Sequence, residues 1–227
     1  MKKVVVLSLG GSLIVPDEID LGFLKKFKDV LEKNKKNYKF VIVCGGGSIA
    51  RKYIHALRES GKSEYLQSMM GIAVTRLNAR FMTSLFGRDA NEGIPHDMKH
   101  VENLLKKDDI VFCGALRYHE KETSDSNAAR LADYFKTDFI NLTNVPGLYD
   151  KNPLENKNAE FIPETSKKEL YQRVKKMKFH PGQNFVIDQH AMKILMESNS
   201  KLYILGKDLK QFDNLLNNKK FIGTVVR

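Results

Sequence analysis

The chain has 227 residues, of which 42% are hydrophobic, so it can bury a sizeable core without disulfides or metal ions. Its formal net charge of +11 favours anionic partners, but it carries no zinc-finger spacing, RNP aromatic pattern or helix-turn-helix signature, so we expect no nucleic-acid partner. No run approaches the roughly 20 apolar residues of a membrane span, and Gly10 and Gly11 interrupt the apolar run that imitates a signal peptide, so we expect a cytoplasmic protein without a membrane partner.

The predicted elements alternate between strand and helix along almost the whole chain. In chain order, short apolar runs predict strands at 3–9, 39–44, 109–113, 138–142, 201–205 and 221–226. Apolar stripes at helical spacing predict helices that include 23–31, 77–86 and 128–135, and Ser124 or Asp125 is placed to cap the third. Nearly continuous apolar strands separated by helices predict an α/β fold with a mainly parallel sheet covered on both faces.

Glycine clusters follow the first two predicted strands. Gly10-Gly11-Ser12 follows the first strand, and Gly45-Gly46-Gly47 follows the second, with Arg51 one turn into a helix expected from Ser48. Glycine lets backbone N–H groups approach an anion, and a helix N-terminus adds its positive end. Neither cluster is a Walker loop or a dinucleotide fingerprint, and either one alone is equally typical of an ordinary strand-to-helix turn. Two on successive strands favour an anion site at the carboxyl edge of the sheet.

A polar loop follows the strand predicted at 138–142. It places Thr143, Asn144, Tyr149 and Asp150 on one strand exit, which suits a purine and a ribose. These residue types also form ordinary turns for local reasons, so the loop alone leaves both interpretations open. The Pro- and Asn-rich stretch 146–163 is the candidate hinge between an N-terminal and a C-terminal half.

The two cysteines and six histidines predict no metal site. Cys44 and Cys113 each end an apolar run, and we expect buried thiols in a reducing compartment rather than a disulfide or a metal pair. The histidines show no metal-ligand spacing. We therefore expect no metal ion held by side chains alone.

Six segments, taken in order, carry a resemblance to a known family. They are Leu9–Ser12, Cys44–Arg51, Gly71–Ala79, Thr123–Asp125, Thr143–Asp150 and Gly223–Val226. Their order and spacing resemble those of the amino acid kinase superfamily, and within it those of the archaeal-type uridylate (UMP) kinases. The resemblance spans nearly the whole chain and implies one domain, residues 1–227, folded as a three-layer αβα sandwich with a mainly parallel central sheet.

The resemblance also implies an activity. Such a kinase transfers the γ-phosphoryl group of ATP to UMP and so makes UDP in pyrimidine nucleotide biosynthesis. It needs Mg²⁺ and is usually a homohexamer. The N-terminal half, about 1–142, would hold UMP, and the C-terminal half, about 143–227, would hold ATP.

Matched motif by motif, the resemblance implies roles for individual residues. Those implied at the transferring phosphoryl group are Ser8, Gly10, Gly11, Ser12, Arg51 and Asp125. Those implied for UMP are Gly46, Ser68, Arg117, Thr123 and Ser124. Those implied for ATP are Gly47, Arg51, Thr143, Asn144, Tyr149 and Asn152.

Four positions depart from the family pattern. Ser8 stands where many members place a lysine on the transferring phosphoryl group, and Lys193 or Lys207 is a candidate replacement. Pro146 replaces an acid. The segment 115–122 is longer and lacks the family's Pro and Gly, although its Arg117 still suits the acceptor phosphate. Ser68 stands where an aspartate usually binds the acceptor ribose, before a turn that we expect at 69–71.

These departures leave two alternatives open. The first is a superfamily kinase with a different phosphate or carboxylate acceptor, which the altered 115–122 segment supports. An isopentenyl phosphate kinase is disfavoured, because that branch places a histidine where Ile49 and Ala50 stand. The second is a non-catalytic oligomer that binds nucleotides or oxyanions, which Ser8 and Pro146 support.

Overall fold

The computed structural model describes residues 2–118, 123–151, 153, 155–175 and 186–227. Its main sheet has seven strands, which lie in the spatial order β3 (Ile110–Cys113), β2 (Tyr38–Cys44), β1 (Lys3–Leu9), β4 (Phe139–Leu142), β8 (Leu202–Leu205), β9 (Thr224–Val226) and β7 (Glu164–Thr165). All neighbouring pairs are parallel except β8 and β9. The predicted mainly parallel sheet is therefore confirmed, and the last strand is shorter than the predicted 221–226.

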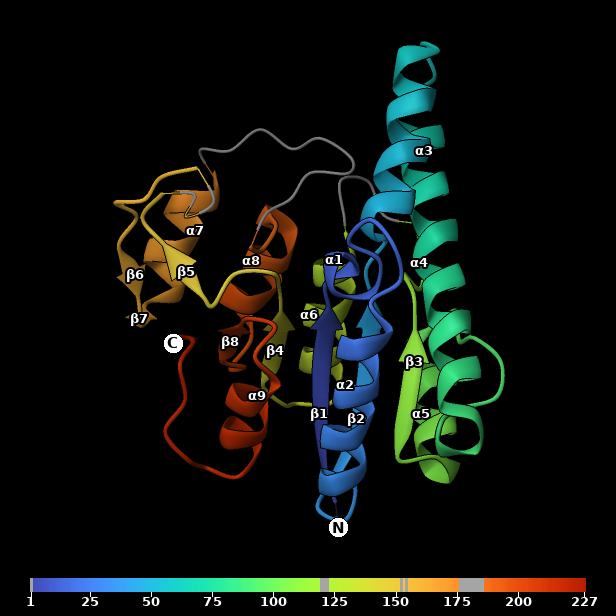
Figure 1. Cartoon of the computed structure of the whole chain (residues 1–227), viewed down its shortest axis with the longest axis vertical. Helices are drawn as coiled ribbons and strands as arrows, with labels where there is room; N and C mark the ends of the chain where they lie inside the picture. The colour runs from blue at the N-terminus through green and yellow to red at the C-terminus, as the bar shows by residue number, and fades with distance from the viewer. Residues whose placement is uncertain (1, 119–122, 152, 154, 176–185) are drawn as a thin grey trace.

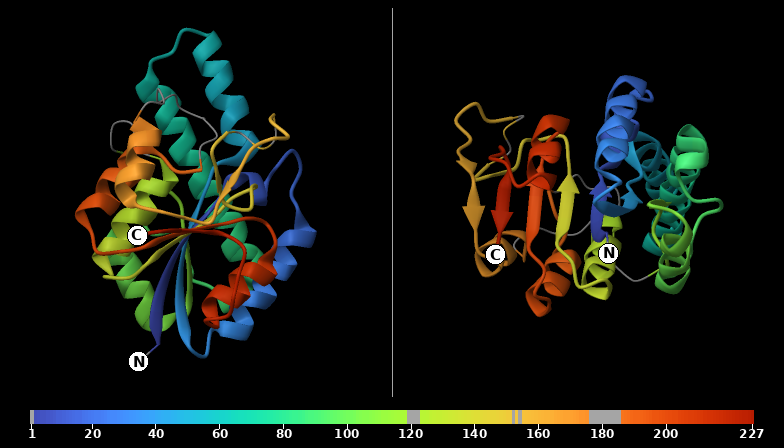
Figure 2. Two further views of the ribbon diagram at one scale, coloured as in Figure 1. Left: turned by 90° about the vertical axis from the view of Figure 1, so that its left-hand side faces the viewer. Right: turned by 90° about the horizontal axis from the view of Figure 1, so that it is seen from below.

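Helices cover both faces of this sheet (Figures 1 and 2). They are α1 (Gly11–Ile14), α2 (Leu21–Asn34), α3 (Gly47–Glu59), α4 (Glu64–Phe86), α5 (Met98–Lys107), α6 (Ser124–Tyr134), α7 (Lys167–Lys175), α8 (Gln189–Glu197) and α9 (Leu209–Leu216), with a short 3₁₀ turn at Gly87–Asp89. Among the described residues no helix is both long and apolar enough to cross a membrane.

Strand β1 shows how the two cores form. Successive side chains of a strand point to opposite faces, so Leu7 packs with Phe27 of α2 and Phe212 of α9, whereas Val6 packs with Leu131 of α6 on the other face. The outcome is a three-layer sandwich whose strands are buried on both sides. Cys44 and Cys113 are free and buried, as expected. Burial raises the pKa of the Cys113 thiol to about 12 and that of Cys44 well above its ordinary value.

Helix α4 corrects the turn expected at 69–71. The helix begins at Glu64, where Ser63 caps it by accepting from the Leu66 N–H, and it runs through Gly71 without a break. A single glycine inside a helix costs only about 1 kcal/mol relative to alanine, and Gly71 faces Ile54 of α3, which packs against this site. Ser68 therefore lies inside the helix and neither precedes a turn nor caps it. Helices α3 and α4 form a hairpin that projects beyond the sheet (Figure 1).

Helix α6 corrects the predicted cap. Its cap is Thr123, whose hydroxyl accepts from the Asp125 N–H at 3.1 Å, and Ser124 and Asp125 both lie in the first turn. Ser and Asp are equally good caps, so composition alone could not choose among three adjacent candidates.

The stretch 146–163 contains a small hairpin. Strands β5 (Leu148–Tyr149) and β6 (Phe161–Ile162) pair antiparallel outside the main sheet. The ring of Tyr149 meets that of Phe161 edge-on, with 5.4 Å between the ring centroids. The candidate hinge thus carries regular structure of its own, and its role as a hinge stays a prediction.

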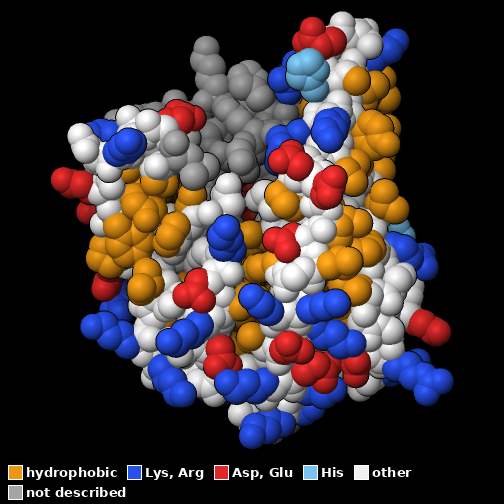
Figure 3. Space-filling view, viewed as in Figure 1, with side chains coloured by type: hydrophobic (Ala, Val, Ile, Leu, Met, Phe, Trp, Pro, Cys, Tyr) orange, Lys and Arg blue, Asp and Glu red, His pale blue; other side chains and the backbone are white. Residues whose placement is uncertain are grey.

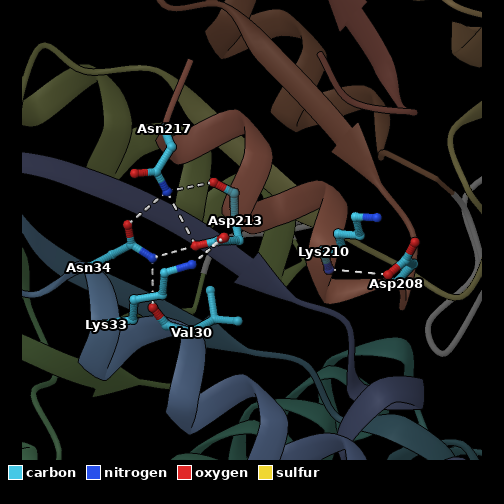
Figure 4. A network of polar contacts seen from close by, with 7 residues as sticks. All are labelled: Val30, Lys33, Asn34, Asp208, Lys210, Asp213 and Asn217. Atoms are coloured by element: carbon cyan, nitrogen blue, oxygen red, sulfur yellow. Dashed lines mark hydrogen bonds and ion pairs between the residues drawn. The ribbon is translucent and has the colours of Figure 1, made fainter. Parts of the chain in front are cut away.

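A polar network joins the two halves at the amino edge of the sheet (Figure 4). Asn34, at the end of α2, donates to Asp213 of α9 at 2.9 Å, and Lys33 donates to the same carboxylate at 2.7 Å. The side-chain amide of Asn217 donates to Asn34 Oδ1 at 3.1 Å. Asn34 is buried, so these bonds satisfy an amide that would otherwise be costly to bury.

Candidate functional site

The two glycine turns lie directly against each other at the carboxyl edge of the sheet. The Gly10 N–H donates to the Leu142 carbonyl at 2.9 Å, and the Gly45 N–H donates to the Leu9 carbonyl at 2.9 Å. A Cβ on Gly11 would lie 1.9 Å from the Gly47 nitrogen, so no other residue fits there. Gly47 also has φ of +65°, which favours glycine. The predicted convergence of these turns is what the structure shows.

The start of α3 adds two polar features to this cradle. Its N-cap position is Gly46, so no side chain caps the first turn. The Ser48 hydroxyl is buried and has no hydrogen-bond partner among the described residues. Arg51 lies one turn further on, half-buried, and no ion pair or hydrogen bond engages its guanidinium in the described part of the chain. Free donors, a helix N-terminus and an uncommitted cation together suit an anion.

Ser8 and Asp125 meet beneath the first glycine turn. Ser8 is fully buried in β1, and its hydroxyl donates to Asp125 Oδ1 at 2.6 Å. Burial raises the pKa of Asp125 to about 7, and the nearby carboxylate of Asp188 adds to this rise. The hydrogen bond from Ser8 acts in the opposite direction and lowers the pKa. A carboxyl group with this pKa changes between its protonated and ionised forms near neutral pH.

Asp188 ties two helix N-termini together under the site. It is 4% exposed and accepts from the hydroxyls of Thr123 at 2.6 Å and Ser126 at 2.9 Å. It also caps α8 by accepting from the N–H groups of His190 and Ala191. The Thr123 hydroxyl, implied for UMP, is therefore already used twice within the protein. Sequence reasoning missed Asp188, although an aspartate before an apolar helical stripe is a recognisable cap signal.

Helix α4 fixes the loops that follow β2 and β3. Thr75 Oγ1 accepts from the Ala115 N–H at 3.0 Å, and Arg76 donates to the carbonyls of Ala115 and Leu116 at 2.9 and 2.6 Å. Asn78 donates to the Gly45 carbonyl at 2.7 Å. Burial lowers the pKa of Arg76. This helix therefore sets the relative position of the glycine turn and the loop that leads to Arg117.

The remaining predicted residues belong to several different elements of the fold. Thr143 follows β4 directly, and its N–H donates to the Leu205 carbonyl at 2.8 Å, while its hydroxyl donates to Asn144 at 3.3 Å. Ser12 lies half-buried in α1, Ser124 half-buried in α6, and Ser68 half-buried in α4. Asn152 lies outside the described residues.

Arg117 is exposed and lines a pocket that includes none of the glycine-turn residues. The pocket has a volume of about 500 Å³ and lies between the start of α5 and α6, and its other lining residues include Asp97, Asn127 and Tyr134. The two candidate replacement cations, Lys193 on α8 and Lys207 after β8, are both exposed. The structure thus brings the glycine turns, Ser8, Arg51 and Asp125 to one edge, and it does not bring Arg117 into that group.

No cluster of side chains offers a dedicated metal cage. In the part of the chain that the structure describes, no three His, Cys, Asp or Glu side chains gather closely enough to hold a metal ion. The glycine cradle and the unpartnered Ser48 hydroxyl instead fit phosphate groups.

Comparison with known proteins gives a consistent set of similarities. The model of the amino acid kinase family matches residues 3–206. A uridylate kinase of Archaeoglobus fulgidus is 35% identical over 225 residues, covering 98% of this chain and 99% of the relative. A uridylate kinase of Thermococcus kodakarensis is 31% identical over 224 residues, covering 98% of both chains. The crystal structure of a uridylate kinase from Archaeoglobus fulgidus superposes with a TM-score of 0.82 at 31% identity, covering 100% of both chains.

Proposed function

This chain belongs to the amino acid kinase family, and from that premise we propose that it is a uridylate kinase, which transfers the γ-phosphoryl group of ATP to UMP. The observation that carries the proposal is similarity over the full length to relatives named uridylate kinase, at 31–35% identity. The glycine cradle at the carboxyl edge of the sheet supports it, because phosphoryl transfer depends on aligning and neutralising two anions rather than on covalent catalysis by the protein.

The proposed mechanism assigns the transferring phosphoryl group to the cradle. The turn Gly10–Ser12 would face it from one side with the N–H groups of Gly11 and Ser12, since the Gly10 N–H already donates to Leu142. Helix α3 with Arg51 would face it from the other side. Arg51 supports this role because it is uncommitted in the described structure. The hydrogen bond between Ser8 and Asp125 holds the end of β1 to the start of α6, which keeps the first turn in place. Mg²⁺, when bound together with ATP, would further neutralise the charge of the phosphates.

The two nucleotides would lie on opposite sides of this group. We assign UMP to the N-terminal half, with Gly46, Ser68, Arg117, Thr123 and Ser124 as the proposed contacts. We assign ATP to the C-terminal half, with Gly47, Arg51, Thr143, Asn144, Tyr149 and Asn152 as the proposed contacts. Thr123 and Arg117 are the least favourably placed of these, since the first is engaged by Asp188 and the second faces a different pocket.

We also propose a cytoplasmic homohexamer, which the resemblance to archaeal-type uridylate kinases implies. An exposed apolar surface along the α3–α4 hairpin, where large side chains face solvent in the single chain, supports self-association but not a particular number of subunits (Figure 3). These side chains are Tyr53, Tyr65, Leu66, Met69 and Leu77, each between 36% and 56% exposed. Exposed apolar patches of this kind mark protein contacts.

The decisive experiment measures ADP release from ATP and Mg²⁺ with UMP, CMP or AMP as acceptor. UMP should be turned over far faster than CMP or AMP, because a site that hydrogen-bonds the uracil edge leaves buried polar groups unpaired with another base. Equal turnover of all three would exclude a uridylate kinase. Turnover of none, with ATP bound, would favour the alternatives of a different acceptor or a non-catalytic binding protein.

A further inference from the structure

One buried hydroxyl holds both strands of the β5–β6 hairpin. Thr224 is fully buried in β9, within the main sheet. Its Oγ1 accepts from the Leu148 N–H at 2.8 Å and donates to the Ile162 carbonyl at 2.6 Å. Leu148 and Ile162 are opposite each other in the hairpin. A single side chain therefore links the paired position of both strands to the main sheet.

The hairpin is seated on the sheet without spare room. A Cβ on Gly147 would lie 2.7 Å from Thr224 Oγ1 and 2.7 Å from the Phe161 ring. Because Thr224 lies in the main sheet, the backbone at Gly147 already packs closely against the sheet, and the two hydrogen bonds of the Thr224 hydroxyl hold the hairpin in that position.

The two ends of the hairpin are held differently. At its outgoing end, the Val225 N–H donates to the Pro163 carbonyl at 2.9 Å, and β7 pairs with β9. At its incoming end, the Leu148 N–H reaches the main sheet through the Thr224 hydroxyl. Loss of that hydroxyl would remove this partner from the buried Leu148 N–H and from the half-buried Ile162 carbonyl, which disfavours the present position of the hairpin.

We propose that Thr224 is a positioning residue for ATP, which acts by fixing the Leu148–Tyr149 strand relative to Thr143 and Asn144. This inference rests on the proposed function, in which the segment from Thr143 to Tyr149 holds ATP. Thr224 itself touches no nucleotide in this scheme. Its contribution is to hold Tyr149 at a set distance from the end of β4.

The test compares the Michaelis constants for ATP and UMP in Thr224→Val and Thr224→Ser. Valine has the shape of threonine without the hydroxyl, so KM for ATP should rise roughly five- to tenfold, while KM for UMP stays within about twofold. Serine retains the hydroxyl and should behave like the native protein. A matched control is Thr137→Val, which removes a bond from a half-buried hydroxyl to the Val4 carbonyl at the opposite edge of the sheet and should change neither constant.

Two results would overturn the inference: a folded Thr224→Val protein with native KM for ATP, or equal rises in both constants. If Thr224→Val does not fold, Gly147→Ala takes its place, because the added Cβ displaces the same strand and should also raise KM for ATP alone. ATP binding by calorimetry separates the two proposals. A native protein that binds ATP but does not phosphorylate UMP contradicts the proposed function, and the calorimetric affinities of the variants then decide the role of Thr224. A native protein that binds no ATP contradicts both.

Discussion

The contribution of Asp125 to the free energy of unfolding should be smaller at neutral pH than in acid, and Asp125→Asn should remove that loss. Burial, followed by the charge of Asp188, raises the pKa of Asp125 from 3.8 to about 7. The hydrogen bond from Ser8 lowers the pKa but does not cancel this rise. Between these two pKa values the folded state keeps a proton that the unfolded chain has lost. The contribution of this group to stability is therefore fully present below pH 3.8, falls as the pH rises toward 7, and is constant above that.

The size of the effect follows from the same pKa difference. At about 1.36 kcal/mol per pKa unit, the rise from 3.8 to about 7 corresponds to about 4 kcal/mol for a carboxyl without solvent contact. Asp125 is only partly buried, and solvent screening reduces that figure, so we expect about 2 to 4 kcal/mol. Asparagine has nearly the same shape and no charge. The free energy of unfolding of the Asp125→Asn protein should therefore exceed that of the native protein by this amount near pH 8. The difference should shrink toward pH 4.

Urea denaturation of both proteins at several pH values between 4 and 8 measures this difference. The matched control is Asp133→Asn on the same helix, where the carboxylate is exposed and pairs with Lys136 at 2.9 Å. That change should alter the free energy of unfolding by no more than about 0.5 kcal/mol at any pH. An Asp125→Asn protein that is no more stable than the native protein near pH 8, or that is more stable by the same amount at every pH, would contradict this prediction.

Three further predictions concern single side chains. Arg51→Ala should lower kcat by roughly a hundredfold without changing the melting temperature, because no ion pair or hydrogen bond engages its guanidinium in the described part of the chain; unchanged kinetics would return it to an ordinary surface role. Arg117→Ala should raise KM for UMP more than KM for ATP in a kinetic assay if it contacts the acceptor, and the opposite pattern would reject that contact. Burial alone would raise the pKa of Asp213, but hydrogen bonds from Lys33 and Asn34 lower it overall. Its contribution is thus present above its ordinary pKa and lost as the pH falls through the lowered value. Asp213→Ala should cost roughly 1–3 kcal/mol in urea denaturation near pH 7 and less in acid, and an unchanged stability near pH 7 would contradict this.

The sequence predicted those parts of the fold that depend on local pattern. Strands such as β1 and β2 are nearly continuous apolar runs, and parallel strands must be buried on both faces, so their positions follow from composition. The glycine turns were predictable because few residues other than glycine permit such a close approach of two backbones. The very short strands β5, β6 and β7 have no such signal, because two residues cannot show a period.

The parts of the candidate site that sequence reasoning missed depend on contacts between distant segments. Asp188 is recognisable as a helix cap, but its bonds to Thr123 and Ser126 join positions more than 60 residues apart. The Thr224 hydroxyl likewise meets Leu148 across 76 positions. The turn expected before Gly71 was wrong because packing between α3 and α4 outweighs the weak helix propensity of one glycine. The local sequence indicates the secondary-structure propensity of a segment, whereas these features depend on tertiary contacts between segments that are distant in the chain.

The place of β1 between β2 and β4 has a consequence for synthesis of the chain on the ribosome. Strand β2 follows β1 closely, but 129 residues, from Gly10 to Asp138, separate β1 from its other neighbour. At roughly 5 to 20 residues per second, translation needs roughly 6 to 26 seconds to deliver β4. During that interval one edge of an almost wholly apolar strand has unpaired N–H and C=O groups, which is the kind of edge on which strands of other chains aggregate. The nascent protein is therefore most in need of a chaperone before its C-terminal half has been made.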